Sequence, residues 1–372
     1  MGHAFAVVGN WARDGRDKGI TVYRKEGDSY ILQKITNYDP AVCAGALLPD
    51  RDRNLLYVTD EIENTKGGGG NILIYHMDAG SGELTLLQSF PSAYAKPDNL
   101  CMTKDKRFLF AVHHGTRARV TKVKRLEDGQ ISSVTEYGDN GISMFRMNEN
   151  GLISALCDIG PSGNDSDIPS IMHSFEIDPS GKMAVATDID RDVISLYRID
   201  EEHEKMELLR RIDDVKGHAP RYGYFHPDLP VYYKNNEQHL SLDSYTYNAA
   251  EGTLAPLQTI PYLQCLEGKF RKYEVSDLKA SADGRNLYVS VRCSNQIVGF
   301  ALDERGMMQE QEAIPSGGES PRGICISPDG RYMYIMHDVS KEITCLEIGT
   351  DGTLKETGYT QADNCPGVMV FM

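Results

Sequence analysis

Hydrophobic and polar residues alternate in short stretches along nearly the whole chain, and turn residues separate these stretches. The segment SPDGRYMYI at residues 327–335 shows the pattern, since a Ser-Pro-Asp-Gly turn precedes aromatic and branched residues that alternate with others. SADGRNLYV at residues 281–289 nearly repeats it. Helix-period stretches are scarce, and residues 201–213 fit a helix or a loop equally well. The pattern predicts an all-β protein built from repeated hairpins.

The hairpin recurs six times when its turn residue is taken as the anchor. The anchors are Asp52, Asp105, Ser180, Asp228, Asp283 and Asp329, at spacings of 53, 75, 48, 55 and 46 residues. After most anchors a further strand pair follows, so that each unit is expected to hold four antiparallel strands. Units of about 40 to 50 residues with four strands each are typical of a β-propeller.

A seventh unit is divided between the two ends of the chain. AFAVVGN, ITVYRKE and ILQKITN supply three strands near the N-terminus, and VMVFM at the C-terminus supplies the innermost one. We therefore expect a seven-bladed β-propeller whose ring is closed by N- and C-terminal strands in one blade. The long interval before Ser180 is expected to hold an extra strand pair, ISMFRMN and LISALCD, followed by the loop PSGNDSD. Because no linker or shift in composition divides the chain, residues 1–372 are expected to form a single propeller domain.

The charge balance restricts the partners. The chain has 39 basic and 54 acidic residues, a net charge of -15, and no basic block, which disfavours nucleic acid and anionic membranes as partners. MGHAFAVVGNW at the start resembles no signal peptide, and no apolar run is long enough to span a membrane. We expect a cytoplasmic protein. Its eight cysteines form no CxxC pair, so buried free thiols are expected.

Polar residues recur at two fixed distances from the anchors. Antiparallel pairing brings the start of the first strand and the end of the second to the same end of each blade. Seven residues before the anchors stand Gly45, Asp98, His173, Arg221, Ser276 and Arg322; nine residues after them stand Glu61, His114, Ile189, Glu237, Arg292 and Asp338. Nine of these twelve are ionisable, against 103 of 372 in the whole chain. The offsets therefore predict a polar ring at the mouth of the central channel, a concave place where small ligands bind.

Five members of this ring belong to four successive blades: His173, Arg221, Glu237, Arg292 and Arg322. A histidine and a carboxylate offer proton transfer, and three guanidinium groups offer binding of an anionic group or an oxyanion. Two alternatives without catalysis are a hydrated polar channel mouth and a structural salt bridge between Arg221 and Glu237.

Other chemistry has little support in the sequence. There is no GxSxG nucleophile motif, and GGGG at residues 67–70 lacks the Lys-Ser or Lys-Thr of a phosphate loop. His113 and His114 are adjacent and would point to opposite faces of a strand. Asp188, Asp190 and Asp192 alternate, but a solvated loop is favoured over a calcium site because no ligand loop with a closing Glu follows.

The chain resembles the seven-bladed propeller lactonases, which include the propeller-type bacterial 6-phosphogluconolactonases and the fungal carboxymuconate-cyclising enzyme. The resemblance spans nearly the whole chain and rests on MHSFEIDPSGK, GHAPRYGYFHPD, YYKNNEQ, VSDLKASADGRNLYVSVR and ESPRGICISPDGRYMYI. It implies that His173, Arg221, Glu237 and Arg292 are the catalytic set. IPSIMH and GHAPRY depart from the usual Pro-His-x-His and Gly-Pro-Arg-His, and the second departure removes a neighbouring histidine.

From these residues we expect a lactonase that hydrolyses a sugar or sugar-phosphate lactone without a cofactor or metal. Either Glu237 or His173 is the base, and the substrate-binding candidates are Arg322, Asp277, His114 and Glu61. The alternatives are a lactonising cycloisomerase of the muconate type and a non-catalytic propeller that binds a protein or metabolite. The expected partner is a small anionic lactone, and the protein is expected to be a monomer or weak homodimer.

Overall fold

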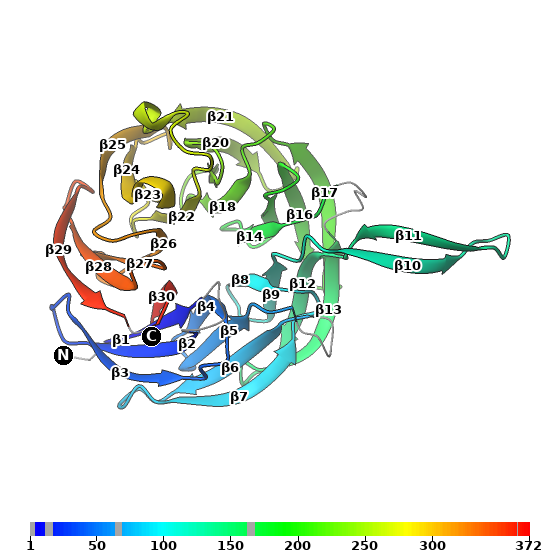
Figure 1. Ribbon diagram of the computed structural model, residues 1–372, viewed down its shortest axis with the longest axis horizontal. Helices are drawn as coiled ribbons and strands as arrows, with labels where there is room; N and C mark the ends of the chain where they lie inside the picture. Colours follow the sequence, from blue (N-terminus) through cyan, green and yellow to red (C-terminus); the bar gives the residue numbers. More distant parts are fainter. Residues whose placement is uncertain (1–3, 12–17, 64–68, 162–167, 363) are drawn as a thin grey trace.

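The computed structural model of the protein describes residues 4–11, 18–63, 69–161, 168–362 and 364–372. In these ranges thirty strands and two short 3₁₀ turns, but no α-helix, are present. Twenty-eight of the strands form seven four-stranded antiparallel sheets, which stand as blades around a central axis (Figure 1). The expected seven-bladed propeller is therefore confirmed.

Each blade has one strand at the channel, and the later strands follow outwards. The innermost strands of blades 1 to 7 are β30 (Pro366–Phe371), β4 (Ala44–Asp50), β8 (Pro97–Met102), β14 (Met172–Ile177), β18 (Pro220–Phe225), β22 (Val275–Ala280) and β26 (Pro321–Ile326). The second strands are β1 (Ala4–Asn10), β5 (Leu55–Asp60), β9 (Phe108–His113), β15 (Met183–Asp188), β19 (Val231–Asn236), β23 (Asn286–Val291) and β27 (Tyr332–His337).

The outer half of each blade completes the sheet. The third strands are β2 (Gly19–Lys25), β6 (Asn71–Met77), β12 (Gly141–Met147), β16 (Val193–Asp200), β20 (Ser241–Asn248), β24 (Gln296–Leu302) and β28 (Glu342–Ile348). The outermost strands are β3 (Leu32–Tyr38), β7 (Leu84–Pro91), β13 (Ile153–Pro161), β17 (Lys205–Asp213), β21 (Thr253–Pro261), β25 (Met308–Pro315) and β29 (Leu354–Gln361).

The ring closes in blade 1, where β1 and β30 are neighbouring strands (Figure 1). β30 pairs antiparallel with β1, with Ala6 opposite Phe371 and Val8 opposite Met369. This is the split blade that the terminal sequences predicted.

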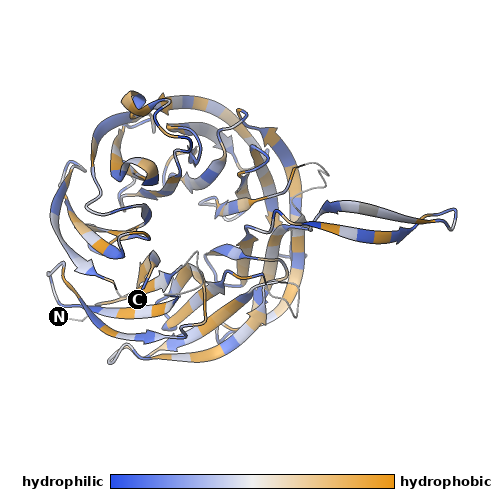
Figure 2. Cartoon of the chain, in the orientation of Figure 1, coloured by the Kyte–Doolittle hydropathy of each residue, from blue (hydrophilic) through white to orange (hydrophobic). Residues whose placement is uncertain are grey.

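The hydrophobic core lies between neighbouring blades. Seven clusters of buried side chains each join two adjacent blades, and together they follow the ring once around. The second strands are buried on both faces, whereas most residues of the outermost strands are exposed or half-buried. Figure 2 shows hydrophobic and hydrophilic residues alternating along the outermost strands.

The tyrosine of the repeated hairpin links one blade to the next. Tyr57, Tyr233 and Tyr288 each donate from Oη to a backbone carbonyl oxygen in a turn of the following blade, at Gly151, Gly306 and Gly352. Tyr334 does the same to Tyr30 across the closing blade, at 2.9 Å. The repeated sequence therefore serves the contact between blades, because a buried hydroxyl requires a partner.

Two expectations about local structure are wrong. ISMFRMN and LISALCD are β12 and β13, the outer half of blade 3, and the extra pair is β10 (Arg119–Arg125) with β11 (Ile131–Tyr137). β10 was missed because it buries no face against the protein and so lacks a hydrophobic side. Residues 205–213 form β17, an outermost strand in which only Met206 is buried, so its apolar positions are too few to define a period.

Further expectations concern loops, cysteines and membrane spans. Most of the loop PSGNDSD and the first two residues of GGGG lie outside the described residues. All eight cysteines are free thiols, and Cys265 alone is exposed. Among the described residues no helix has the length and hydrophobicity that a membrane crossing needs.

Candidate active site

A cavity of about 500 Å³ opens at the end of the channel where the first strands begin and the second strands end. Eight of the twelve residues that the offsets placed on this ring line it: Glu61, His114, His173, Ile189, Arg221, Glu237, Arg292 and Arg322. A smaller chamber of about 190 Å³ shares Glu61, His173, Arg221 and Arg322 with it and adds Gly45 and Asp98. The sequence pattern therefore located the ring correctly.

A β-bulge gives these side chains their direction. In blades 2 to 7 the register between the first and second strands shifts at the channel mouth. The residues within the six shifts include Gly45, Asp98, His173, Arg221, Ser276 and Arg322, which are the six found before the anchors. A bulge interrupts the alternation of a strand and re-aims the side chain that it carries, often beside an active site.

Glu237 and Arg221 form the centre of the site. Arg221 Nε donates to Glu237 Oε2 at 2.9 Å, and Arg221 Nη1 donates to the backbone oxygen of Ser276 at 3.0 Å. Arg292 Nη2 lies 3.6 Å from Glu237 Oε1, and Arg292 Nε donates to the backbone oxygen of Glu274 at 2.8 Å. The carboxylate is thus held between two guanidinium groups, with Oε1 the more loosely held oxygen.

These contacts set the charges of the cluster. Burial by itself would raise the pKa of Glu237, but Arg221 and Arg292 outweigh burial and hold that pKa below its ordinary value. Burial and the nearby Arg221 lower the pKa of Arg292 to about 10, which still leaves it charged at neutral pH. The site therefore presents one ionised carboxylate between two cations.

His173 lies beside this cluster and is neutral. Burial, then Arg221 and His114, keep the pKa of His173 well below its ordinary value. Its ring packs edge-on against Tyr222 at 4.9 Å between centroids and against His114 at 6.2 Å. Burial, with Arg117 and Lys96, also lowers the pKa of His114 to about 4. Both histidines can donate or accept a hydrogen bond but carry no charge at neutral pH.

Glu61 approaches from the opposite side of the ring, since it follows β5 in blade 2 whereas Glu237 belongs to blade 5. Its Oε2 is buried without a hydrogen-bond partner, and it lines both cavities. Burial raises the pKa of Glu61 to about 7, although Arg322 and Lys96 oppose this. Gly45 leaves the space that this carboxyl occupies, because a Cβ there would lie 2.4 Å from Oε2.

Asp98 is the next acid in the chamber. Both of its oxygens are buried without a hydrogen-bond partner, and its Oδ2 lies 3.6 Å from His173 Nδ1. Burial, and then the negative charge of Glu61, raise the pKa of Asp98 well above its ordinary value. The pKa values of Glu61 and Asp98 are therefore raised, in contrast to that of Glu237.

Asp277 differs from the other predicted binding residues. It lines the inner chamber and not the outer cavity. Its oxygens accept from the backbone N–H groups of Leu278 at 2.9 Å and Ile324 at 2.8 Å, and Lys279 Nζ lies 3.2 Å away. These contacts join blades 6 and 7, so the geometry gives Asp277 a structural place beneath the site.

Comparison with known proteins decides the family. Residues 5–371 match the family described as "Lactonase, 7-bladed beta-propeller". The chain belongs to this family.

Solved structures agree with this fold. A periplasmic gluconolactonase of Pseudomonas aeruginosa is 21% identical, with 100% of this chain and 99% of that chain covered and a TM-score of 0.81. A candidate 6-phosphogluconolactonase from Bacteroides uniformis is 20% identical, with 100% of both chains covered and a TM-score of 0.80. A Lactobacillus plantarum protein is 15% identical, with 100% and 99% covered and a TM-score of 0.76. These likenesses concern the propeller fold.

Sequence reasoning missed the outer lip of the cavity in this member of the family. Lys18, Lys96, Arg117 and Lys272 add cations, and Trp11, Cys43 and Glu274 complete the lining. In all, seven cationic and three acidic side chains line the cavity, although the chain as a whole is acidic. Cys43, Lys96 and Glu274 each stand nine residues before an anchor, at Asp52, Asp105 and Asp283, so a third offset could have found them. Trp11, Lys18, Arg117 and Lys272 lie in connections that differ between blades.

Trp11 supports one of the predicted arginines. The Arg322 guanidinium carbon lies 4.0 Å from the centroid of the Trp11 ring, a cation–π contact that fixes the guanidinium plane at the channel. The single tryptophan of the chain therefore belongs to the site. The sequence pattern did not indicate this, because Trp11 lies in a connection between strands.

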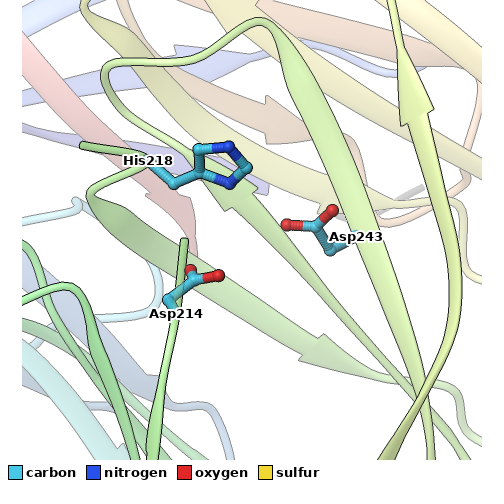
Figure 3. Close-up of side chains that lie close together, drawn as sticks. All are labelled: Asp214, His218 and Asp243. Atoms are coloured by element: carbon cyan, nitrogen blue, oxygen red, sulfur yellow. The ribbon is translucent and has the colours of Figure 1, made fainter. Parts of the chain in front are cut away.

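A second cluster of possible metal ligands lies in blade 5 and the connection before it. Figure 3 shows Asp214, His218 and Asp243 converging, with ligand atoms within 4.8 Å of one another. However, Lys234 Nζ lies 2.6 Å from Asp214 Oδ2 and 2.6 Å from Asp243 Oδ2. Thr259 and Asn236 donate to Asp243 as well. One buried ammonium group thus already binds both carboxylates, and the cluster does not fit a metal centre.

The three alternating aspartates have structural partners. Asp188 accepts from the Ile171 N–H, Asp190 binds Arg117 through two bonds, and Asp192 accepts from the N–H groups of Gly217 and Ala219. Asp188 ends β15 and is buried, so the solvated-loop interpretation is wrong for it. Asp190 and Asp192 lie in the turn that follows, and each of the three carboxylates has its own structural contact.

Proposed function

We propose that the protein hydrolyses a sugar-derived lactone that carries an anionic group, most simply a phosphate, at the cavity of the channel mouth. The observation that carries the proposal is the ionised Glu237 held by Arg221 and Arg292 within a cationic cavity. Membership of the propeller lactonase family supports the reaction class. No cofactor is required, because water, a base and oxyanion donors suffice for ester hydrolysis.

Glu237 is the base in this proposal. Its side chain is 19% exposed against 7% for His173, and it is ionised while the histidine is neutral. Glu237 Oε1 takes a proton from the water that attacks the lactone carbonyl carbon, as the carbonyl π electrons move to its oxygen. A low pKa makes this carboxylate a weak base, and Arg221 compensates by fixing its orientation.

Arg292 and Arg322 stabilise the negative charge that develops on the carbonyl oxygen of the lactone. Arg292 uses only Nε for its backbone bond to Glu274, and its guanidinium lines the cavity together with that of Arg322. Guanidinium groups bind carboxylate, phosphate and oxyanion groups through paired N–H donors. One arginine binds the carbonyl oxygen as it becomes an oxyanion, while the cations of the lip hold the anionic group of the substrate.

Glu61 supplies the proton that completes the reaction. When the tetrahedral intermediate collapses, the carbonyl re-forms, the bond to the ring oxygen breaks, and that oxygen takes the proton of the Glu61 carboxylic acid. Glu61 is suited to this role because it faces Glu237 across the ring and has a pKa of about 7. Glu237 then releases its proton to water, Glu61 regains one from water, and the hydroxy acid product leaves.

Charge indicates the class of substrate. Seven cations line the cavity in a chain of net charge -15. Arg117 is paired with Asp190 and Lys96 with Glu63, so the attraction for an anionic ligand at this mouth rests mainly on Lys18, Lys272 and Arg322. The chamber behind it contains hydrogen-bond acceptors without donors on Glu61, Asp98 and Asn99. A molecule with an anionic group at one end and hydroxyl donors at the other matches both, as a phosphorylated aldonolactone does.

The test is a panel of substrates for the wild-type protein. Proton release is followed at constant pH with freshly prepared 6-phosphogluconolactone and unphosphorylated aldonolactones, and ring closure is followed with a muconate. The proposal predicts hydrolysis, fastest with the phosphorylated lactone. Muconate turnover without lactone hydrolysis would favour a cycloisomerase, and no turnover of any of them would favour a binding protein.

A further inference from the structure

A two-stranded hairpin extends from blade 3, away from the ring. β10 and β11 form a separate sheet, and Figure 1 shows them projecting beyond the outermost strands of the blades. We refer to residues 119–137 as the arm. None of its residues lines the cavity of the candidate active site. The arm therefore requires an explanation other than the proposed reaction.

The contacts within the arm are exposed and polar. Lys122 Nζ lies 3.0 Å and Lys124 Nζ 3.5 Å from Glu136 Oε1 across the two strands. Thr121 and Thr135 share a hydrogen bond across the strands at 3.1 Å, and Arg119 lies over the Tyr137 ring at 4.9 Å. Val123 is 70% exposed and Ile131 is 66% exposed (Figure 2 shows apolar and polar positions mixed along the arm). A lone two-stranded hairpin is at best marginally stable in water, and three or more strands are needed for independent stability. The arm is thus incomplete as a sheet.

The two edges of the arm differ in charge. β10 carries four cations in seven residues, Arg119, Lys122, Lys124 and Arg125. β11 carries a single charged residue, Glu136. Lysine and other charges on an edge strand prevent pairing with another chain, whereas an edge without them is open to it. The edge of β11 is therefore the one available for a further strand.

We infer that two copies of the protein join through their arms, with β11 of one pairing antiparallel with β11 of the other to form a four-stranded sheet. In the register of greatest overlap, Ile131 lies opposite Tyr137 of the second copy, and Ser133 lies opposite its Thr135. Aromatic and β-branched pairs of this kind stabilise a sheet, and the register opposes no like charges. The arrangement is isologous and closes as a dimer.

Self-pairing of β10 would be unfavourable. Its register of greatest overlap places Arg119 opposite Arg125 and Lys122 opposite Lys122. Like charges directly opposite destabilise a sheet. A polyanion or an anionic membrane would instead be drawn to β10, but the rest of the chain is strongly acidic and would repel it. A second copy through β11 is the occupant that the charges favour.

The experiment measures mass in solution by light scattering after size exclusion, over a concentration series. The wild-type protein is expected at twice 41.4 kDa at high concentration. The double variant Ser133→Lys with Thr135→Lys opposes lysines across the two-fold axis and is expected to be a monomer. Ser133→Glu with Thr135→Glu is expected to be a monomer for the same reason. A mixture of the two variants is expected to form a heterodimer, because each lysine then faces a glutamate.

A matched control places the same charges elsewhere. Gln309→Lys with Gln311→Lys adds two lysines to the exposed outermost strand β25 and is expected to leave the dimer intact. Far-ultraviolet circular dichroism of each variant verifies that the blades are folded. A monomeric wild-type protein at every concentration would overturn the inference, as would a dimer that persists in both charged variants. Failure of the mixture to associate would overturn the proposed register.

Discussion

Arg221 Nε donates to Glu237 Oε2 at 2.9 Å at the open end of one hairpin, where Arg221 lies in the bulge of β18 and Glu237 directly follows β19. The second guanidinium bond, from Nη1 to the Ser276 carbonyl, ties the arginine to the next blade. The orientation of the proposed base is therefore fixed by two blades at once.

We predict that Arg221→Lys lowers kcat by about 10- to 100-fold while the protein stays folded. An ammonium group keeps the charge but cannot make both guanidinium bonds, so Glu237 loses its fixed orientation. The pKa of Glu237 should also move upwards, and the acid limb of the kcat profile should shift to higher pH. Steady-state kinetics from pH 3 to pH 8 checks both effects, and an unchanged kcat and acid limb would contradict this role.

Glu61 gives a prediction about the alkaline limb of the pH profile of kcat/KM. Because its pKa is raised to about 7, the acid form is present below that pH and is lost as the pH rises through it. After subtraction of the uncatalysed rate, kcat/KM for an aldonolactone should fall above about pH 7. Glu61→Gln should remove this limb and lower the rate below pH 7 by about 100-fold.

A lactone with a phenol leaving group, such as dihydrocoumarin, is the control for Glu61. A phenolate leaves without a proton, so Glu61→Gln should change its hydrolysis little if Glu61 is the acid. An equal loss for both lactones would indicate a structural role instead.

Glu61 also gives a prediction about stability. In the folded protein its pKa is raised from the ordinary value of 4.5, so its contribution to stability is present below pH 4.5 and is lost as the pH rises through about 7. Glu61→Gln should therefore gain stability relative to the wild type between pH 5 and pH 8.

The lip of the cavity is predicted to recognise the anionic group. Lys272→Ala removes one of its cations and should raise KM for a phosphorylated lactone several-fold, with little change for the neutral lactone. Added salt should reduce the difference between the two proteins, because it screens exposed charges. The reverse result, an equal change for both substrates, would place the anionic group elsewhere.

Closure of the ring gives a prediction about stability. Phe371 in β30 is 1% exposed, and its ring centroid lies 5.6 Å from that of Tyr334 in blade 7. Phe371→Ala should reduce the free energy of unfolding by about 3 to 5 kcal/mol, because it leaves a cavity between the first and last blades. Tyr359→Ala, at an exposed aromatic, is the matched control and should cost far less. Equal effects in denaturant titrations would contradict the role of β30.

The repeat explains how much of the fold the sequence could predict. The Asp-Gly hairpins at Asp283 and Asp329 define the blade. Fixed offsets from the anchors Asp228 and Asp283 identify Arg221, Glu237 and Arg292 as neighbours, and in the structure they are in contact. The bulges could not be predicted, because a bulge depends on pairing between two strands. Lys272 and Trp11 were missed because they lie in connections with no counterpart in other blades.

The arm could not be predicted from the pattern of hydrophobic residues. Hydrophobic alternation identifies strands that bury one face, and β10 buries none within its own chain. The extra strand pair was therefore predicted at β12 and β13, whose apolar pattern is clear, although the inserted pair is β10 and β11. Asp277, one residue after the offset position Ser276, was predicted to bind substrate, but its carboxylate accepts from the backbone N–H groups of Leu278 and of Ile324 in the next blade.

The central claim is that Glu237 activates water for lactone hydrolysis. The measurement that tests it most directly is proton release from 6-phosphogluconolactone at constant pH by the wild type, by Glu237→Gln and by the remote control Glu251→Gln. We expect Glu237→Gln to lose about 10²- to 10⁴-fold in kcat/KM and Glu251→Gln to match the wild type. Wild-type rates from Glu237→Gln, in a protein that hydrolyses the lactone, would contradict it.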